Sequence, residues 1–313
     1  MNIGNIKTPI NYVGEELNNK LFIKREDFIP FSFGGNKARK AQLFFEEIEK
    51  GNFDCVVTYG SSSSNHCRII SNAARSMEIP CYIISPEEAS VPTYNSQMMR
   101  LFGAEITTVP LNEVHETINK KLDDLKCSEK NPYFIPGGGH GNIGTQAFVN
   151  CYNEIKQYES INKVFFDYIF HASGTGTTQA GLICGQLISG VDRKIIGISI
   201  ARKNPRGRQV VLDSVNEYMT YNQIYIAKEK IESATIFDDS YIGDGYGKNN
   251  YSKVIDDVLM KYGIPLDSIY TGKAYYGMLE FLKKNKIINK NILFIHTGGT
   301  PLFFDYLKRG TNV

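Results

Sequence analysis

Short apolar runs alternate with longer helix-like stretches along this chain, and this alternation limits its fold more than any other feature. Seven runs are expected to form strands: Leu21–Lys24, Cys55–Tyr59, Tyr82–Ser85, Glu105–Val109, Val164–His171, Ile195–Ile200 and Ile292–His296. Several are apolar throughout, which is typical of strands buried on both faces of a parallel sheet. Helices are expected at Asn36–Lys50, Asn65–Met77, Thr178–Ser189 and Ser252–Tyr262, each ending near a glycine or a proline. The pattern predicts an α/β fold with open, twisted, mostly parallel sheets.

The length of the chain predicts two domains. With 313 residues it exceeds what a single hydrophobic core usually serves. The glycine-rich segment at residues 136–141 marks a point where the chain leaves one sheet. We therefore predict a small α/β domain at residues 41–147, inserted into a large domain made of residues 1–40 plus 148–313.

Composition excludes some classes of partner. Apolar residues make up 42% and charged residues 22%, as in an ordinary globular protein. The net charge of +2 gives no basis for binding nucleic acid or an anionic membrane. The six cysteines are scattered and form no metal-like cluster, which favours free thiols in a reducing compartment. With no signal peptide and no apolar run long enough for a membrane helix, we expect a cytoplasmic protein.

Three loops rich in glycine or hydroxyl groups follow predicted strands, at residues 60–64, 173–178 and 297–300. Ligands of open α/β sheets bind at the carboxyl ends of strands, so one shared site is expected. In the second loop, the glycines let backbone N–H groups approach an anion at a helix start, and threonines add donors: Gly174, Thr175, Gly176, Thr177 and Thr178. The loop lacks the lysine of a nucleoside-triphosphate loop, and Gln179 breaks the dinucleotide spacing. A phosphate monoester fits better, with an ordinary strand-to-helix turn as the alternative.

A lysine stands where a predicted helix begins. Lys37 follows Gly34-Gly35-Asn36. A partly desolvated lysine near a helix start has a lowered pKa, and its neutral amine can form an imine with an aldehyde. Position alone leaves Arg39 and Lys40 as competitors for this role, and a solvated surface lysine is the more ordinary interpretation.

The loop at residues 60–64 continues into an asparagine and a histidine. Ser62, Ser63 and Ser64 can bind a substrate carboxylate through hydroxyl and backbone donors, unless the loop is merely flexible. Asn65 can donate to a cofactor oxygen. His66 is either a substrate-binding group or a packed residue, which is the more common role of a lone histidine.

Six elements, in order from about residue 20 to residue 306, resemble the D-cysteine desulfhydrase and 1-aminocyclopropane-1-carboxylate (ACC) deaminase branch of fold-type II pyridoxal-phosphate enzymes. They are Lys24–Asp27 with Gly34–Lys40, Ser64–His66, Ala172–Leu182, Tyr241–Gly247, Asp267–Ala274 and Phe294–Pro301. The resemblance implies a two-domain fold similar to the tryptophan synthase β subunit, with pyridoxal 5'-phosphate between the domains, a small amino-acid substrate and a homodimer.

The resemblance also implies roles for individual residues. Lys37 would hold the cofactor as a Schiff base and carry protons. Asn65 would hydrogen-bond the ring hydroxyl, and Gly174 to Thr178 would hold the phosphate. Ser64 would contact the substrate carboxylate or act in proton transfer, with Tyr246 and Tyr270 lining the pocket. Thr271 would lie at the pyridine nitrogen.

The residue at position 271 bears on the reaction. ACC deaminase resembles this segment but has a glutamate there, which would strengthen the ring as an electron sink. A neutral hydroxyl suits β-elimination, giving a 2-oxo acid and ammonia. Ring opening, β-replacement and racemisation with the same cofactor stay open, as does a different class, a non-catalytic amino-acid-binding protein. The basic residues Arg202, Lys203, Arg206 and Arg208 are either a solvated face or a contact for an anionic substrate tail.

Overall fold

The computed structural model describes residues 6–243 and 251–310. Within them the strands form two sheets, one in the order β1-β2-β10-β7-β8-β9 and one in the order β5-β4-β3-β6. Their bounds are β1 Ile10–Glu16, β2 Asn19–Arg25, β3 Cys55–Tyr59, β4 Cys81–Pro86, β5 Glu105–Val109, β6 Pro132–Ile135, β7 Tyr168–Ser173, β8 Lys194–Ser199, β9 Ile236–Asp238 and β10 Asn291–His296. Only β1 and β2 pair antiparallel; the other described neighbours are parallel. The predicted α/β fold is confirmed.

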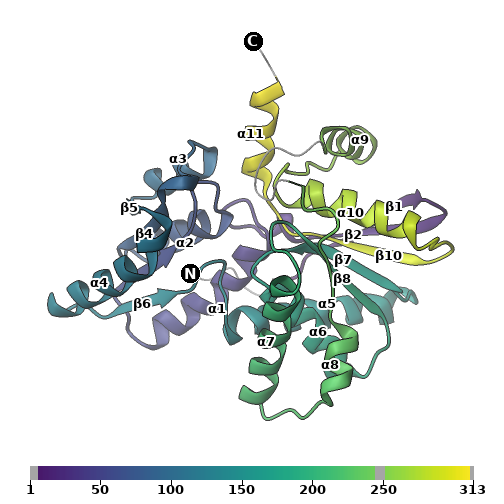
Figure 1. Ribbon diagram of the computed structural model, residues 1–313, viewed down its shortest axis with the longest axis horizontal. Helices are drawn as coiled ribbons and strands as arrows, with labels where there is room; N and C mark the ends of the chain where they lie inside the picture. Colours follow the sequence, from purple (N-terminus) through teal and green to yellow (C-terminus); the bar gives the residue numbers. More distant parts are fainter. Residues whose placement is uncertain (1–5, 244–250, 311–313) are drawn as a thin grey trace.

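Helices surround both sheets (Figure 1). Their bounds are α1 Asn36–Lys50, α2 Asn65–Ser76, α3 Tyr94–Leu101, α4 Val114–Cys127, α5 Asn142–Asn162, α6 Thr177–Ser189, α7 Arg206–Tyr221, α8 Lys228–Ala234, α9 Ser252–Tyr262, α10 Thr271–Lys284 and α11 Thr300–Gly310. No helix in the two described ranges is long and apolar enough to cross a membrane. All six cysteines are free thiols, and all but Cys127 are buried.

The structure contains elements that the sequence pattern did not predict, among them the helices α3, α4, α5, α7, α8, α10 and α11, and it shifts one predicted strand. Three strands were not predicted: β1, β6 and β9. The strand expected at Val164–His171 lies at Tyr168–Ser173 instead. Residues 164–167 lie between the end of α5 and this strand, and the Phe166 N–H donates to the Glu159 carboxylate of α5 at 2.8 Å. Apolar composition alone had extended that strand too far toward its N-terminus.

Helix α1 lies between the two sheets (Figure 1). Its apolar side, including Ala38, Ala41 and Phe45, belongs to the core under the four-stranded sheet. All strands of that sheet fall within residues 41–147, whereas α1 begins before them and crosses position 41. The division at residues 41 and 147 stays a prediction, and α1 is the element shared by the two parts.

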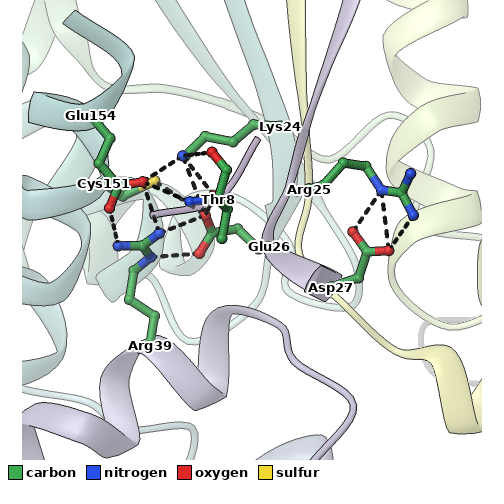
Figure 2. A network of polar contacts seen from close by, with 8 residues as sticks. All are labelled: Thr8, Lys24, Arg25, Glu26, Asp27, Arg39, Cys151 and Glu154. Atoms are coloured by element: carbon green, nitrogen blue, oxygen red, sulfur yellow. Dashed lines mark hydrogen bonds and ion pairs between the residues drawn. The ribbon is translucent and has the colours of Figure 1, made fainter. Parts of the chain in front are cut away.

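A buried network of charges joins α1 to the six-stranded sheet (Figure 2). Glu26 opens the 3-10 helix η1 (Glu26–Phe28) and accepts from Arg39 Nε at 2.5 Å and Nη2 at 2.9 Å. Arg39 Nη1 also donates to Glu154 of α5 at 2.5 Å. Lys24 of β2 donates to Glu154 at 2.8 Å and to the hydroxyl of Thr8, which itself donates to Glu26. Two cations and two carboxylates thus satisfy one another away from solvent.

The pKa of Glu26 shows how much this network depends on pairing. Burial alone would raise that pKa, but Arg39 and Lys24 lower it from 4.5 to about 2. Because the folded pKa lies below the unfolded one, the carboxylate stabilises the fold above about pH 4.5. That contribution, about 3 kcal/mol, is lost as the pH falls from 4.5 toward 2.

We therefore expect Glu26→Gln to lower the free energy of unfolding by about 3–5 kcal/mol, because it leaves a buried guanidinium with half of its charge compensation. Urea unfolding at pH 7 measures the loss. Glu105→Gln is the matched control, since its 2.7 Å pair with Lys121 is exposed and should contribute below about 1 kcal/mol. An equal loss of unfolding free energy in both variants would contradict the assigned role of Glu26. The same holds if Glu26→Gln leaves the pH dependence of stability between pH 4.5 and 2 unchanged.

Candidate active site

The start of α1 is fixed by two loops. Gly35 precedes the helix with φ of 98°, and a Cβ there would lie 2.7 Å from the Thr297 carbonyl oxygen. The Asn36 N–H donates to that same oxygen at 2.9 Å, and the Asn36 side-chain amide donates to Thr178 at 3.1 Å. The residue before Lys37 is therefore held both by the loop after β10 and by the loop after β7.

Lys37 points at the glycine-rich segment that follows β6. Its half-buried amine donates to the Gly138 carbonyl oxygen at 2.9 Å. Gly138 has φ of 72°, and a Cβ there would lie 2.7 Å from the Thr175 methyl group and 3.1 Å from Lys37 Nζ. Burial lowers the pKa of Lys37 to about 8. A sizeable fraction of the amine is therefore neutral close to pH 7, which suits a lysine that forms an imine.

One helical turn further on, Lys40 reaches the same place. Its side chain is 1% exposed and donates to the Thr177 hydroxyl at 2.6 Å, with the Gly138 carbonyl oxygen 3.5 Å away. No carboxylate in the described residues forms an ion pair with Lys40. Burial, and then the charge of Lys37, lower its pKa well below the usual value. A buried amine that faces an anion-binding loop and has no protein carboxylate favours an anionic ligand, which would hold its positive charge.

The loop at residues 173–178 has the geometry of an anion site. It leaves β7 at Ser173 and enters α6 at Thr177, with Gly176 at φ of 95° just before the helix. The first N–H groups of a helix have no intrahelical partner and favour an anion. Thr177 and Thr178 are fixed by Lys40 and Asn36 respectively. Of the three cationic competitors, Arg39 is occupied by carboxylates, while Lys37 and Lys40 face this loop.

The serine loop is only partly available to a ligand. The Ser62 hydroxyl donates to the carbonyl oxygens of Ala89 and Val91, at 2.7 and 2.5 Å. Ser63 Oγ lies 3.1 Å from Ser61 Oγ. Ser64 caps α2 by accepting from the Cys67 N–H at 3.1 Å, so its hydroxyl proton is still available to donate. The loop is braced rather than flexible, and Ser64 is the serine best placed to act on a ligand.

His66 turns away from the loop. Its ring is 3% exposed, with Nε2 2.9 Å from the Thr58 hydroxyl. Since Thr58 donates its own proton to Ile135, the histidine Nε2–H is the donor in this pair. Burial, together with the charges of Lys37 and Lys40, lowers the pKa of His66 well below 6.5. A neutral, inward-turned ring supports the packed alternative over the predicted substrate contact.

Thr271 is also committed to a protein partner. It is fully buried, and its hydroxyl donates to Asp267 Oδ2 at 2.7 Å and accepts from the Asp267 N–H at 2.9 Å. Asp267 accepts further N–H bonds from Ile269 and Tyr270 and so caps the start of α10. A hydroxyl in this state has no proton left to donate to a pyridine nitrogen. The predicted contact of Thr271 stays a prediction, and the geometry supports the turn-residue alternative.

Of the two tyrosines predicted to line the pocket, the structure describes only Tyr270. Tyr270 is half-buried and directly precedes α10, whereas Tyr246 lies outside the described residues. Two further residues gather at the site without a role assigned from sequence. Thr297 is 7% exposed beside Asn36, and Asn95 of α3 donates to Asn65 at 2.9 Å. The segment 294–301 signalled the first; no local pattern signalled the second.

Comparisons with known proteins identify a family for the chain. Residues 2–298 match the family described as pyridoxal-phosphate dependent enzymes. The chain belongs to this family. D-cysteine desulfhydrase of Yersinia pestis is 31% identical over 308 residues, covering 95% of this chain and 90% of the relative. A Pyrococcus abyssi protein named as a candidate 1-aminocyclopropane-1-carboxylate deaminase is 30% identical over 310 residues, covering 96% and 91%.

Solved structures lead to the same family. The crystal structure of an ACC deaminase homologue superposes with a TM-score of 0.88 at 28% identity, covering 97% of this chain and 93% of that one. An O-acetylserine sulfhydrylase of Entamoeba histolytica, at 20% identity and a TM-score of 0.65, shares the fold. The prediction of a pyridoxal-phosphate enzyme of this branch is confirmed, and the non-catalytic alternative is set aside.

The residues present fit pyridoxal phosphate. The phosphate would meet the loop at Gly174–Thr178, with Lys40, which has no described carboxylate partner, as its counter-ion. Lys37, one helical turn away, has the lowered pKa needed to bond the cofactor's aldehyde carbon. The donor set therefore accounts for both the anionic and the electrophilic end of this cofactor.

The lowered pKa of Lys37 predicts its reactivity in the cofactor-free protein. We expect its acetylation rate, measured by peptide mass spectrometry after brief exposure to acetic anhydride, to rise to half its maximum near pH 8. Lys283 is the control, because its hydrogen bond to Glu280 raises its pKa, so its rate should rise at higher pH. A Lys37 profile that follows that of Lys283 would show that its amine is not desolvated.

Lys40→Met should separate stability from cofactor binding. Removing a buried, unpaired cation should leave the free energy of unfolding of the cofactor-free protein unchanged or raise it by about 1 kcal/mol. The affinity for pyridoxal phosphate should fall at least about tenfold, because a charge-assisted contact is lost. Lys24→Met is the matched control: it removes one of the two cations that pair with Glu154, so it should destabilise the fold and change cofactor affinity less. The reverse pattern would refute a phosphate contact by Lys40.

Proposed function

We propose that this enzyme eliminates a β-substituent from a small amino acid, with Lys37 as the cofactor lysine, and releases a 2-oxo acid and ammonia. Sulfide is the leaving group we favour, as in the named activity of D-cysteine desulfhydrase, which is similar over 95% of this chain. One observation carries the proposal: the desolvated amine of Lys37 and the Lys40 amine, which has no described carboxylate partner, converge on Gly138 beside Thr177. We also propose a cytoplasmic homodimer, as the family resemblance implies.

The chemistry divides between the cofactor and this chain. When bound, pyridoxal phosphate supplies an electron-withdrawing ring that stabilises negative charge at the substrate's α-carbon. Lys37 Nζ is proposed to take the α-proton as the β-substituent leaves, which a pKa of about 8 allows near neutral pH. Ser64, whose hydroxyl proton is free of its capping role, is proposed to donate to the substrate carboxylate. Tyr270, which directly precedes α10, is proposed to assist the proton transfer.

Elimination is favoured over ring opening by the surroundings of position 271. The chain has a hydroxyl there, and its proton already goes to Asp267. Asp267 in turn is used by the N–H groups of residues 269–271 at the start of α10. This segment therefore offers no carboxylate to the ring nitrogen, so the cofactor ring would be a weaker electron sink. That suits a reaction in which the carbanion expels its leaving group at once. Ring opening of ACC is the second candidate, because a relative at 30% identity carries that name.

Product analysis tests the proposal. Protein loaded with pyridoxal phosphate is incubated with D-cysteine, L-cysteine, β-chloro-D-alanine or ACC, and sulfide, 2-oxo acid and ammonia are quantified. Cysteine plus water should give equal amounts of sulfide, pyruvate and ammonia. Lys37→Ala should lose at least about a thousandfold in rate, since both the anchor and the base are removed. Borohydride should fix the cofactor's mass on the peptide that contains Lys37.

The outcomes separate the alternatives. 2-Oxobutanoate from ACC without sulfide from cysteine would replace elimination by ring opening. Inversion of chirality without release of ammonia would indicate a racemase. Cofactor fixed on a lysine other than Lys37 would overturn the site itself.

A further inference from the structure

We infer that Asn95 is a positioning residue that sets the direction of the Asn65 side-chain amide, so that Asn65 offers its NH2 group, and not its oxygen, to the bound cofactor. Asn95 is the second residue of α3 and lies in a different element from Asn65, which begins α2. The inference rests on the proposed site, in which Asn65 contacts the cofactor.

The hydrogen bonds fix which amide atom is which. Asn95 Nδ2 lies 2.9 Å from the Ser63 carbonyl oxygen, and a backbone carbonyl can only accept. The same Nδ2 lies 2.9 Å from Asn65, so the Asn65 atom that it meets must be the acceptor, Oδ1. Arg68, which has donors only, approaches this oxygen at 3.4 Å. Asn65 Nδ2 is therefore the group left for a ligand.

The position of Asn95 is unfavourable for one of its own polar atoms. It is fully buried, and its own Oδ1 has no hydrogen-bond partner among the residues that the structure describes. A buried polar oxygen without a partner costs about 1–3 kcal/mol. Turning the Asn95 amide over would satisfy that oxygen no better, since it would then face the Ser63 carbonyl. The hydrogen bonds from its NH2 group to Ser63 and Asn65 therefore explain why an asparagine lies here, and apolar packing alone does not.

The amide that Asn95 orients lies within electrostatic reach of the cofactor lysine. The charge of Lys37 contributes to the pKa shifts of His66 and Cys67, which occupy the first turn of α2 directly after Asn65. A donor offered at this point stabilises an ionised oxygen on the cofactor, whereas an acceptor repels it. The direction of one amide therefore changes both the affinity and the visible spectrum of the bound cofactor.

Asn95→Asp is the decisive variant. The new carboxylate cannot donate to Asn65, so the Asn65 amide should turn over and present its oxygen to the cofactor. We expect the dissociation constant for pyridoxal phosphate, measured by titrating cofactor-free protein, to rise about tenfold, and the visible absorption band and its pH dependence to shift. In an Asn65→Ala background the same substitution should change neither quantity by more than about twofold.

Asn19→Asp is the matched control. Asn19 is equally buried and donates to two backbone carbonyls, of Leu17 and Ile287, both at 2.9 Å, but lies at the start of β2. It should lower the unfolding midpoint while leaving the cofactor's affinity and spectrum unchanged. If Asn95→Asp does not fold, Asn95→Ala removes the donors without adding charge and should raise the dissociation constant about threefold.

Three results would overturn the inference: wild-type affinity and spectrum in both Asn95 variants, the same changes in Asn19→Asp, or an undiminished effect in the Asn65→Ala background. A protein that binds cofactor but releases no 2-oxo acid would refute the proposed reaction only. The affinity comparison would still decide the role of Asn95.

Discussion

The buried ion pair between Glu26 and Arg39 is the interaction on which the site depends. It holds α1 to the six-stranded sheet, while the apolar side of the same helix packs under the four-stranded sheet. With 100° between successive residues, Arg39 points away from the direction shared by Lys37 and Lys40. One helix therefore carries its structural cation on one side and its two site amines on another, and fixing the first places the others.

Two buried cations of α1 differ in how the fold meets their charge, and the contrast supports a ligand beside Lys40. Arg39 meets two carboxylates, so its charge is fully compensated within the fold. Lys40 meets a hydroxyl and a carbonyl oxygen but no described carboxylate. Since an uncompensated buried charge is unfavourable, the fold alone does not account for Lys40. A bound cofactor phosphate would account for it. Replacing Lys40 should therefore leave the cofactor-free protein as stable or more stable, but should weaken cofactor binding.

The local sequence predicts the bounds of helices and strands better than it predicts which way a side chain points. Helix α1 and strands β3 and β5 have their predicted bounds, because a glycine after a helix and a run of β-branched residues are local signals. Strand β6 was missed since it has four residues and includes Pro132, and β1 is joined to β2 through Leu17 and Asn18, both with positive φ in place of the usual glycine. The inward turn of His66 depends on Thr58, a partner from another element that no pattern around the histidine could reveal.

The same limit explains why Asn95 was not found from sequence and why the two parts of the chain act on one site. The residue before it, Tyr94, donates its N–H to Asp305 of α11 at 3.2 Å, so the start of α3 is held by the C-terminal helix (Figure 1). Thr93 donates to the Ser62 carbonyl oxygen at 2.6 Å, and Asn95 donates to Ser63 and Asn65. Three consecutive residues thus connect α11, the serine loop and the amide at the start of α2. Because those contacts share one short stretch of backbone, the placement of α3 against α11 and the direction of the Asn65 amide are set together.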